Sequence, residues 1–420
     1  MTYKYKDPSL TLRMTNNNYN MDKNIYEEAY NINAWEEFYK DYSENEHAYK
    51  TKVLDLKEYI DSGAYLNILK EYEASGSFPL PRLVRINKKG SEKKRTVFAF
   101  DRDASWLLKF FGYMLHCYDD IFCDNLYSFR KERSVKTAVA RLVKQKDIPV
   151  MHGMKLDIHD YFNSANTDEL LKKLQEVFKG QEKLFGLFKT ILSEPDILSA
   201  EGRKACPINK GMMAGSPLSP FLANLYLNEL DRHFEEADIF YARYSDDILF
   251  FTDTEEERDT EYQNILDFLE KHGLTLNPDK VKYIAPGENF EFLGFGFSKY
   301  GIDVSKTSFE KIKRKIRRKA RAVLRWKKKK EVEPEKAVKV FIRYFNRKFF
   351  ENPVKSELTW CRWYFPIITS DRSLKGIDHY LQENIRFVYC GRHSKRGFNL
   401  RYARMKELGY RSLVNEFHKE

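Results

Sequence analysis

The feature that most restricts the fold of this chain is a pair of adjacent acids between two short apolar segments. Residues 239–243 and 248–252 have the composition of β-strands, and Tyr244-Ser245-Asp246-Asp247 connects them. A hairpin selected for stability alone prefers Asn-Gly or Asp-Gly at its turn, and two neighbouring carboxylates repel each other. A divalent cation relieves this repulsion, because Mg²⁺ prefers hard oxygen ligands. An ordinary solvated turn is the alternative interpretation.

A second strand-like segment also ends in acids. Residues 151–158 alternate in polarity and contain Asp157 near their end, followed by Asp160, Tyr161 and Phe162. Carboxylates at the ends of two neighbouring strands can share two metal ions about 3.5 to 4 Å apart. Such a pair of ions aligns an attacking 3′-hydroxyl and a leaving pyrophosphate for in-line displacement. The two acidic strand ends therefore predict nucleotidyl transfer.

The wider pattern predicts an α+β fold. After a basic hairpin near residue 90, the segments run strand, helix, helix, hairpin, helix and strand, which is typical of an α+β unit with an antiparallel sheet. Residues 1–65 predict a helical extension of unknown function. The expected helices cover residues 103–118, 134–142, 168–178, 219–234, 255–272 and 309–326, and the expected strands cover residues 83–86, 96–100, 151–158, 239–243, 248–252 and 290–297.

Charge is divided unevenly along the chain. Residues 301–420 hold 32 Lys and Arg against 13 Asp and Glu, a net charge of +19, whereas the whole chain carries +11. Aromatic residues are interleaved with this positive charge, which suits a polyanion with phosphates at its edge and bases to stack on. The pattern predicts nucleic-acid binding, with a solvated lysine-rich helix face as the alternative.

Composition also excludes several classes of protein. No run of apolar residues approaches the roughly 20 that a membrane span needs, and the N-terminus is polar, unlike a secretory signal. The five cysteines include no Cys-x-x-Cys pair, which argues against a disulfide framework and a structural zinc module. We expect a cytoplasmic protein with reduced thiols and no membrane partner.

Several segments resemble, in order, the motifs of the reverse transcriptases, and among them the bacterial group II intron, retron and defence-associated lineages. The resemblance implies a right-hand polymerase fold with a helical extension (1–65), fingers (66–150), an antiparallel-sheet palm (151–303), and a basic helical thumb with a C-terminal RNA-binding element (304–420). A capping helix is the alternative for that last element. The matching segments are residues 128–134, 155–162, 214–224, 241–247, 276–280 and 292–295.

The resemblance implies a role for each acid. Asp157 and Asp246 would be the principal ligands of two Mg²⁺ ions, with Asp247 beside them and the carbonyl of Ile158 as a further oxygen; Mn²⁺ is a possible substitute. Lys280 would protonate the leaving pyrophosphate, although a surface lysine is the alternative.

A nucleotide-binding set follows from the same resemblance. Phe162 lies where the family keeps an aromatic steric gate against a 2′-hydroxyl, with a core phenylalanine as the alternative. Arg95 and Lys88 of the fingers hairpin would contact the triphosphate, and Lys93 and Lys94 are rival candidates. The remaining expected nucleotide contacts are Asp160, Tyr161, Ala214 and Gly215.

The expected primer and template contacts lie in three segments. Arg130 and Arg133 would contact template phosphates or pair with acids in the fingers. Ser245 replaces a usual Ala beside the primer end, and Ala214 replaces a usual Gln that contacts nucleotide and template, which puts ordinary fidelity in doubt. The other expected contacts are Tyr244, Phe292, Leu293 and Gly294.

We therefore expect an RNA-directed DNA polymerase. Its partners would be a dedicated noncoding RNA template, the complementary DNA product and deoxynucleoside triphosphates, with anti-phage defence as the setting and an open oligomeric state. The absence of a ribonuclease H-like or Cys/His endonuclease segment weakens a mobile-intron role. The alternatives are a template-independent or low-fidelity deoxynucleotide polymerase, a maturase-like RNA-binding protein, and an RNA-dependent RNA polymerase.

Overall fold

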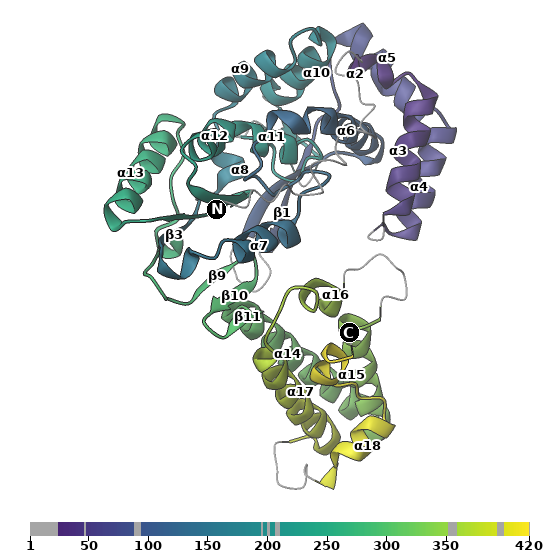
Figure 1. The fold of residues 1–420 in the computed structure, drawn as a ribbon. Coiled ribbons are helices and arrows are strands. Elements are labelled where there is room, and N and C mark those ends of the chain that lie inside the picture. Colours follow the sequence, from purple (N-terminus) through teal and green to yellow (C-terminus); the bar gives the residue numbers. More distant parts are fainter. Residues whose placement is uncertain are drawn as a thin grey trace.

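The chain forms a large mixed body and a smaller helical body joined by a small sheet (Figure 1). The computed structural model describes residues 24–45, 48–87, 94–194, 196–199, 202–205, 211–351, 359–392 and 399–419. Within these ranges no helix is both long enough and apolar enough to cross a bilayer.

The centre of the large body is a four-stranded antiparallel sheet. Its strand order is β6-β7-β3-β8, which confirms the predicted antiparallel sheet, the predicted hairpin and the strand that ends in Asp157. The helix expected over 219–234 is two helices, because the backbone leaves helical geometry at Leu227 (φ −104°, ψ 10°). The strands are β3 (His152–Asp157), β6 (Phe240–Tyr244), β7 (Asp247–Thr252) and β8 (Lys282–Ile284), and the accompanying helices are α8 (Tyr161–Ser164), α9 (Thr167–Val177), α10 (Glu182–Ser193), α11 (Ser219–Tyr226), α12 (Asn228–Glu236), α13 (Glu255–Lys271) and η4 (Pro278–Lys280).

A second sheet contains the predicted fingers hairpin. Strands β1 (Arg82–Asn87) and β2 (Lys94–Ala99) pair antiparallel as expected, but β1 also pairs in parallel with β4 (Ile197–Leu198), so this sheet is mixed. Neither β4 nor its partner β5 (Lys204–Ala205) was predicted. The helices that follow the hairpin are α6 (Arg102–Met114), η2 (Leu115–Ile121), α7 (Val135–Lys144) and η3 (Ile148–Val150).

The N-terminal helices share the core of the large body. The ring of Trp35 stacks on that of Phe110, with 4.2 Å between centroids, and both side chains are buried. The amide of Ile25 donates to the side chain of Gln181, 156 residues later. The helical layer runs beyond residue 65 to Ser75, through α2 (Ile25–Glu28), α3 (Ile32–Glu44), α4 (Lys50–Asp61) and α5 (Ala64–Ser75).

The helical body has a core of its own. The predicted apolar face of the first thumb helix is buried, at Ile312, Ile316, Ala320 and Val323. Asp378 accepts hydrogen bonds from Tyr410, Ser412 and two following amides, which fastens the C-terminal segment to this body. Its elements are α14 (Lys306–Lys329), α15 (Pro334–Phe349), α16 (Trp360–Tyr364), α17 (Arg372–Cys390), α18 (Tyr402–Glu407) and α19 (Leu413–Phe417).

The small sheet between the bodies contributes to both cores. Strands β9 (Phe290–Phe292), β10 (Phe295–Ser298) and β11 (Gly301–Val304) pair antiparallel in the order β11-β10-β9. Phe292 packs with side chains of the palm sheet, whereas Phe295 packs with the thumb helices.

Candidate active site

Three carboxylates that are distant in sequence meet at one end of the palm sheet. Asp157, the last residue of β3, lies directly opposite Asp247, the first residue of β7. Opposite residues of an antiparallel pair present their side chains on one face, with Cβ atoms about 4.5 to 5.5 Å apart. Asp246 lies in the adjoining turn, and its carbonyl accepts a hydrogen bond of 3.1 Å from the amide of Ile158. The predicted convergence of the acids is therefore present.

The environment of the turn acids disfavours their negative charge. Burial raises the pKa of the Asp246 carboxyl, and repulsion by Asp157 raises it further. Burial also raises the pKa of Asp247, although the nearby Lys155 opposes that shift. The carboxylate cluster therefore gains stability from added positive charge.

Two lysines supply part of that positive charge. Nζ of Lys280 lies 2.5 Å from Oδ2 of Asp157, and the lysine side chain remains half exposed. Nζ of Lys155 lies 3.4 Å from Oδ1 of Asp247. Lys280 was among the predicted catalytic residues, but Lys155 was not. Its position two residues before Asp157, on the same face of β3, was the signal that could have identified it.

The acidic cluster is not a closed metal cage. Among the residues with described coordinates, no group of three or more His, Cys, Asp and Glu side chains is arranged to hold a metal ion. Instead, the amine of Lys280 lies beside the carboxylate of Asp157, and the amine of Lys155 lies beside that of Asp247. The donors are all oxygen, which is the chemistry that Mg²⁺ and Mn²⁺ accept.

The segment after Asp157 turns sharply and separates three predicted nucleotide contacts. Asp160 is exposed in a left-handed conformation (φ 44°). Tyr161 points into the core, where its hydroxyl donates to the carbonyl of Ala223 at 2.5 Å, so its ring is directed away from a nucleotide, and a contact through its backbone stays a prediction. Phe162 is half buried against the core, and its carbonyl accepts from the amide of Met212 at 2.8 Å.

The Gly-Ser-Pro turn connects the palm to the fingers. The carbonyl of Ala214 accepts from the amide of Phe98 in β2 at 2.7 Å. The side chain of Ala214 is buried, and its contact with a nucleotide stays a prediction. Gly215 is exposed with φ 95°, and a Cβ there would lie 3.0 Å from Cβ of Val97. The turn therefore presents Gly215, and not Ala214, to the surface.

The structure describes only two of the four fingers residues that are candidates for contact with the triphosphate. Arg95 lies in β2, where its backbone pairs with Ile86. Lys88 and Lys93 lie outside the described residues. Lys94 is the first residue of β2. The assignment of a triphosphate contact among these four residues stays a prediction.

The two arginines expected at the template have intramolecular partners instead. Arg130 donates to the carbonyls of Cys123 and Asp119, each at 2.7 Å, and burial lowers its pKa. Arg133 forms an ion pair with Asp124 in the fingers, which was the alternative interpretation of this residue. Template contact by Arg130 is not favoured, because both terminal nitrogens of its guanidinium already donate to backbone carbonyls.

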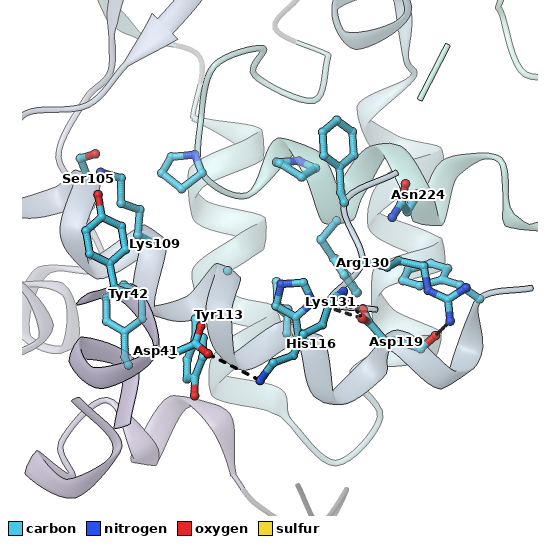
Figure 2. A pocket seen from close by; sticks show the side chains of 18 of the residues that line it. Asp41, Tyr42, Ser105, Lys109, Tyr113, His116, Asp119, Arg130, Lys131 and Asn224 are labelled. Carbon is cyan, nitrogen blue, oxygen red and sulfur yellow. Dashed lines mark hydrogen bonds and ion pairs between the residues drawn. The ribbon is translucent and has the colours of Figure 1, made fainter. Parts of the chain in front are cut away.

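A cavity of about 650 Å³ is lined on one side by the N-terminal helix α3 and on the other by α6 and the loop around Arg130 (Figure 2). Its wall includes Tyr42 of α3, Lys109 and Tyr113 of α6, Arg130, and the predicted Gly215. The N-terminal extension thus forms one side of a hollow that reaches a residue of the predicted nucleotide site.

The predicted primer contacts occupy two tight turns. Leu293 and Gly294 both have positive φ (51° and 91°), as a two-residue type I′ hairpin turn requires, and the carbonyl of Gly294 accepts from the amide of Ser305. Phe292 is buried, so it supports this turn from below, and its part in primer binding stays a prediction. Tyr244 is half buried, and the backbone of Ser245 is buried beneath the acids.

Comparison with known proteins identifies the family. Residues 86–297, half of the chain, match the family described as reverse transcriptase (RNA-dependent DNA polymerase). The chain belongs to this family, and its palm sheet with paired acids has the corresponding right-hand polymerase architecture. DNA synthesis on an RNA template is the activity that this membership assigns, and reverse transcriptase domains generally depend on a divalent metal ion.

Individual relatives narrow the lineage. The chain is 23% identical over 242 residues to the retron Ec86 reverse transcriptase of Escherichia coli, covering 56% of this chain and 68% of that protein. It also matches apo telomerase from Candida tropicalis at 13% identity and a TM-score of 0.45, over 86% of this chain and 65% of that one. A C-terminally truncated form of that telomerase matches at 14% identity and 0.43, over 59% and 60%. The sequence similarity to the retron enzyme supports a bacterial retron-like reverse transcriptase. The TM-scores to the telomerases are too low to support an assignment.

Proposed function

We propose that the three-carboxylate cluster is the site of DNA synthesis. Asp157 and Asp246 would bind two Mg²⁺ ions, Mn²⁺ could replace them, and Asp247 with the Ile158 carbonyl would supply further oxygens. Bound ions of this kind activate the attacking hydroxyl and stabilise the leaving pyrophosphate. The observation that carries the proposal is the pairing of Asp157 with Asp247 across β3 and β7.

The chain's own residues complete the proposed site. Lys280 neutralises Asp157 before substrate enters and would then be placed to donate a proton to pyrophosphate. Phe162, half buried and fixed through its carbonyl, would exclude a 2′-hydroxyl from the sugar position. Fingers residues of the β1–β2 hairpin, Arg95 first among them, would hold the triphosphate.

A basic hollow on the thumb supports binding of the nucleic-acid backbone. Among the residues that the structure describes, a cavity of about 430 Å³ is lined by the rings of Trp360 and Tyr364 and by cationic side chains of α14 and α15, without an acid. Lys and Arg at such a surface neutralise phosphates without reading sequence. These cationic residues are Lys311, Arg314, Lys315, Arg318 and Lys348.

We further propose that the template is a dedicated noncoding RNA, in a role in anti-phage defence. This proposal rests on the similarity to a retron enzyme. Sequencing the nucleic acid that co-purifies with the protein from its native host tests it. One RNA recovered together with its complementary DNA supports the proposal, whereas random cellular RNA without complementary DNA contradicts it.

Primer extension tests the catalytic assignment directly. The wild-type protein should extend a DNA primer on an RNA template with deoxynucleotides and Mg²⁺, and Asp157→Asn should abolish extension while retaining the fold. Lys173→Ala provides a control, since Lys173 pairs with Glu229 on the helical side of the palm. Equal activity of Asp157→Asn and the wild type would exclude this site.

A further inference from the structure

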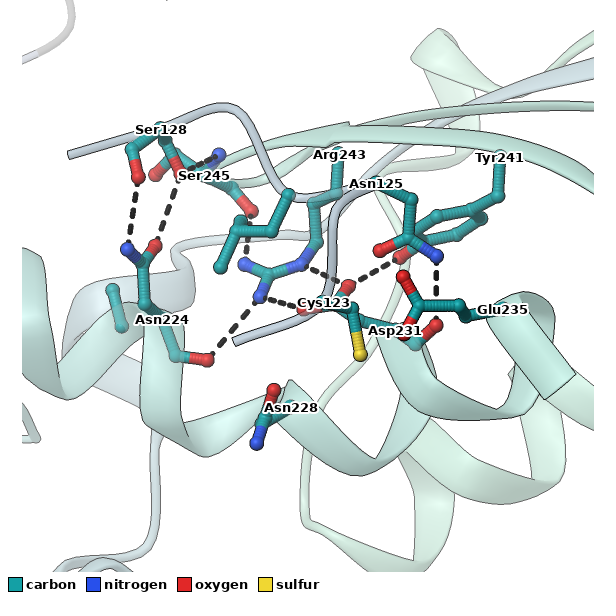
Figure 3. A network of polar contacts seen from close by, with 12 residues as sticks. Cys123, Asn125, Ser128, Asn224, Asn228, Asp231, Glu235, Tyr241, Arg243 and Ser245 are labelled. Atoms are coloured by element: carbon teal, nitrogen blue, oxygen red, sulfur yellow. Dashed lines mark hydrogen bonds and ion pairs between the residues drawn. The ribbon is translucent and has the colours of Figure 1, made fainter. Parts of the chain in front are cut away.

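A buried ion pair of Asp231 and Arg243 lies close to Ser245, the residue before Asp246 (Figure 3). Nε of Arg243, in β6, lies 2.6 Å from Oδ1 of Asp231, in α12, and a second guanidinium nitrogen contacts Oδ2. The hydroxyl of Tyr241 donates to the same carboxylate at 3.1 Å. Neither charged side chain has any exposed surface.

Stability alone is a poor explanation for this pair. Removing two charges from water costs several kcal/mol per ion, and apolar residues of similar volume often replace a buried pair with no loss of stability. Breaking such a pair at one side, in contrast, leaves an uncompensated charge and is strongly destabilising. A buried pair at this location therefore calls for a second role.

The remaining donors of Arg243 point to the catalytic turn. One guanidinium nitrogen donates to the carbonyl of Ser245 at 3.2 Å, and another donates to the carbonyl of Asn224 at the same distance. The amide of Ser245 donates to the hydroxyl of Ser128 at 2.9 Å, and that hydroxyl donates to Asn224. Buried side chains thus hold the peptide groups on both sides of Ser245.

Ser245 needs this support because its backbone is left-handed. Its φ is 60°, a conformation that is strained for a non-glycine residue and persists only where the surroundings impose it. Asp246 is the next residue, so the orientation of its carboxylate depends on the Ser245 peptide. A different conformation at Ser245 would turn Asp246 away from Asp157.

The same pair also connects the turn to the fingers loop. The amide of Arg243 donates to the carbonyl of Asn125 at 3.0 Å, and the carbonyl of Arg243 accepts from the amide of Tyr127 at 2.9 Å. The side chain of Asn125 donates to the carbonyl of Asp231 at 2.8 Å. The loop that contains Ser128 is therefore fixed by the residues that form the ion pair.

We infer that Asp231 and Arg243 are positioning residues for the catalytic metal site: they lock Ser245 in its left-handed conformation and so aim the Asp246 carboxylate at Asp157. This inference rests on the proposed function, since it concerns the same carboxylates. It adds a role for two residues that contact neither substrate nor metal.

The decisive experiment replaces the pair as a unit with apolar residues, Asp231→Leu together with Arg243→Met. We expect a folded protein with a moderately lower melting temperature, because neither charge is left alone but the Tyr241 hydroxyl and the Ser245 and Asn224 carbonyls lose their partners. We expect kcat to fall about 100-fold, the effect of a misplacement of roughly 1 Å, while KM for the primer-template changes by less than about threefold. Mn²⁺ binding, measured by electron paramagnetic resonance on the protein with primer-template and a non-hydrolysable deoxynucleotide, should weaken about tenfold.

A second readout follows the turn itself. Hydrogen exchange at the Ser245 amide should accelerate in the double variant, because its conformation is no longer imposed, while amides of the thumb helices keep their protection. A stable double variant with wild-type kcat, Mn²⁺ affinity and Ser245 exchange would overturn the inference and leave the pair a purely structural one.

Ser128→Ala keeps the test decisive if the double variant does not fold. It removes the acceptor of the Ser245 amide and should lower kcat about tenfold, with recovery in Ser128→Thr, which keeps the hydroxyl. Unchanged kcat in Ser128→Ala would count against the inference. Asp378→Asn is the matched control, a buried acid with several donors in the thumb, and it should lower stability without changing Mn²⁺ affinity.

The controls separate this inference from the proposed function. A wild-type protein that cannot extend a primer would refute the proposed function, whereas hydrogen exchange at Ser245 would still report whether the pair fixes the turn. An active wild type with unaffected variants would refute the positioning role alone.

Discussion

A single methyl group at Gly211 should disturb the proposed sugar-selecting residue. Gly211 has φ 51°, and a Cβ at this position would lie 2.2 Å from the carbonyl oxygen of Phe162 and 2.8 Å from backbone atoms of Asn163. Both obstacles are backbone, so neither can rotate aside. Separating the Cβ and the Phe162 oxygen to an ordinary contact requires a shift of roughly 1 Å between the two segments.

The expected magnitude of Gly211→Ala has two components. The left-handed conformation costs an alanine about 1 to 2 kcal/mol, and the forced displacement costs a further 1 to 3 kcal/mol, so we expect roughly 2 to 5 kcal/mol of lost stability. A displacement of about 1 Å at a substrate-positioning residue can lower kcat by 100-fold. Because Phe162 is the displaced residue, the loss should be larger for deoxynucleotides than for ribonucleotides.

The assay measures single-nucleotide incorporation with each deoxynucleotide and its ribonucleotide counterpart. Gly287→Ala is the matched control: Gly287 has φ 75°, but its Cβ would meet no atom of the described residues within 4 Å, so only the conformational cost applies. Gly211→Ala should lower discrimination against ribonucleotides, and Gly287→Ala should not. Identical selectivity and stability in the two variants would refute the reasoning.

Other predictions concern the same site and the thumb. Phe162→Ala should admit ribonucleotides, and strict deoxynucleotide selectivity of this variant in primer extension would show that Phe162 is not the gate. Asp246→Asn should reduce extension about 1000-fold yet raise the melting temperature at neutral pH. Burial and repulsion raise the pKa of Asp246, so its charge destabilises the fold above that pKa, and the stability gain should shrink as pH falls through it. Lys280→Met should lower kcat by at least about 100-fold, because the proposed proton donor is lost. It should also lower the Mg²⁺ concentration for half-maximal rate, because a cation that competes for Asp157 is removed. A higher Mg²⁺ requirement in rate titrations would contradict this. Arg314→Gln with Arg318→Gln should reduce the slope of log Kd against log salt by up to about two, and an unchanged slope in binding titrations would place the duplex elsewhere.

The meeting of the acids could be predicted from sequence because it depends on strand ends. Asp157 ends one short strand and Asp247 begins another, and such strands pair within one sheet. Which of the neighbouring aromatic side chains would be buried could not be predicted in the same way. The left-handed backbone at Asp160 starts a short helix, and this turn decides that Tyr161 enters the core and Phe162 stays at its edge.

Interaction partners that are distant in the sequence were the hardest part of the site to predict. Arg130 looked like a template contact because it lies in a family motif, yet its donors close on carbonyls of its own loop. Lys155 was overlooked because only strand pairing brings it to Asp247. Strands β4 and β5 have two residues each, which is too short to produce a detectable alternation.

The small sheet beside the palm has a consequence for how a growing duplex would be advanced. Its turn at Leu293 and Gly294 is bonded to the start of α14, and the carbonyl of Gly294 receives the Ser305 amide. Phe292, on the preceding strand, is anchored among palm side chains. A rotation of the thumb would therefore move the turn that is expected to hold the primer's end. Translocation of the duplex by one nucleotide and renewed contact with the primer end would then occur together.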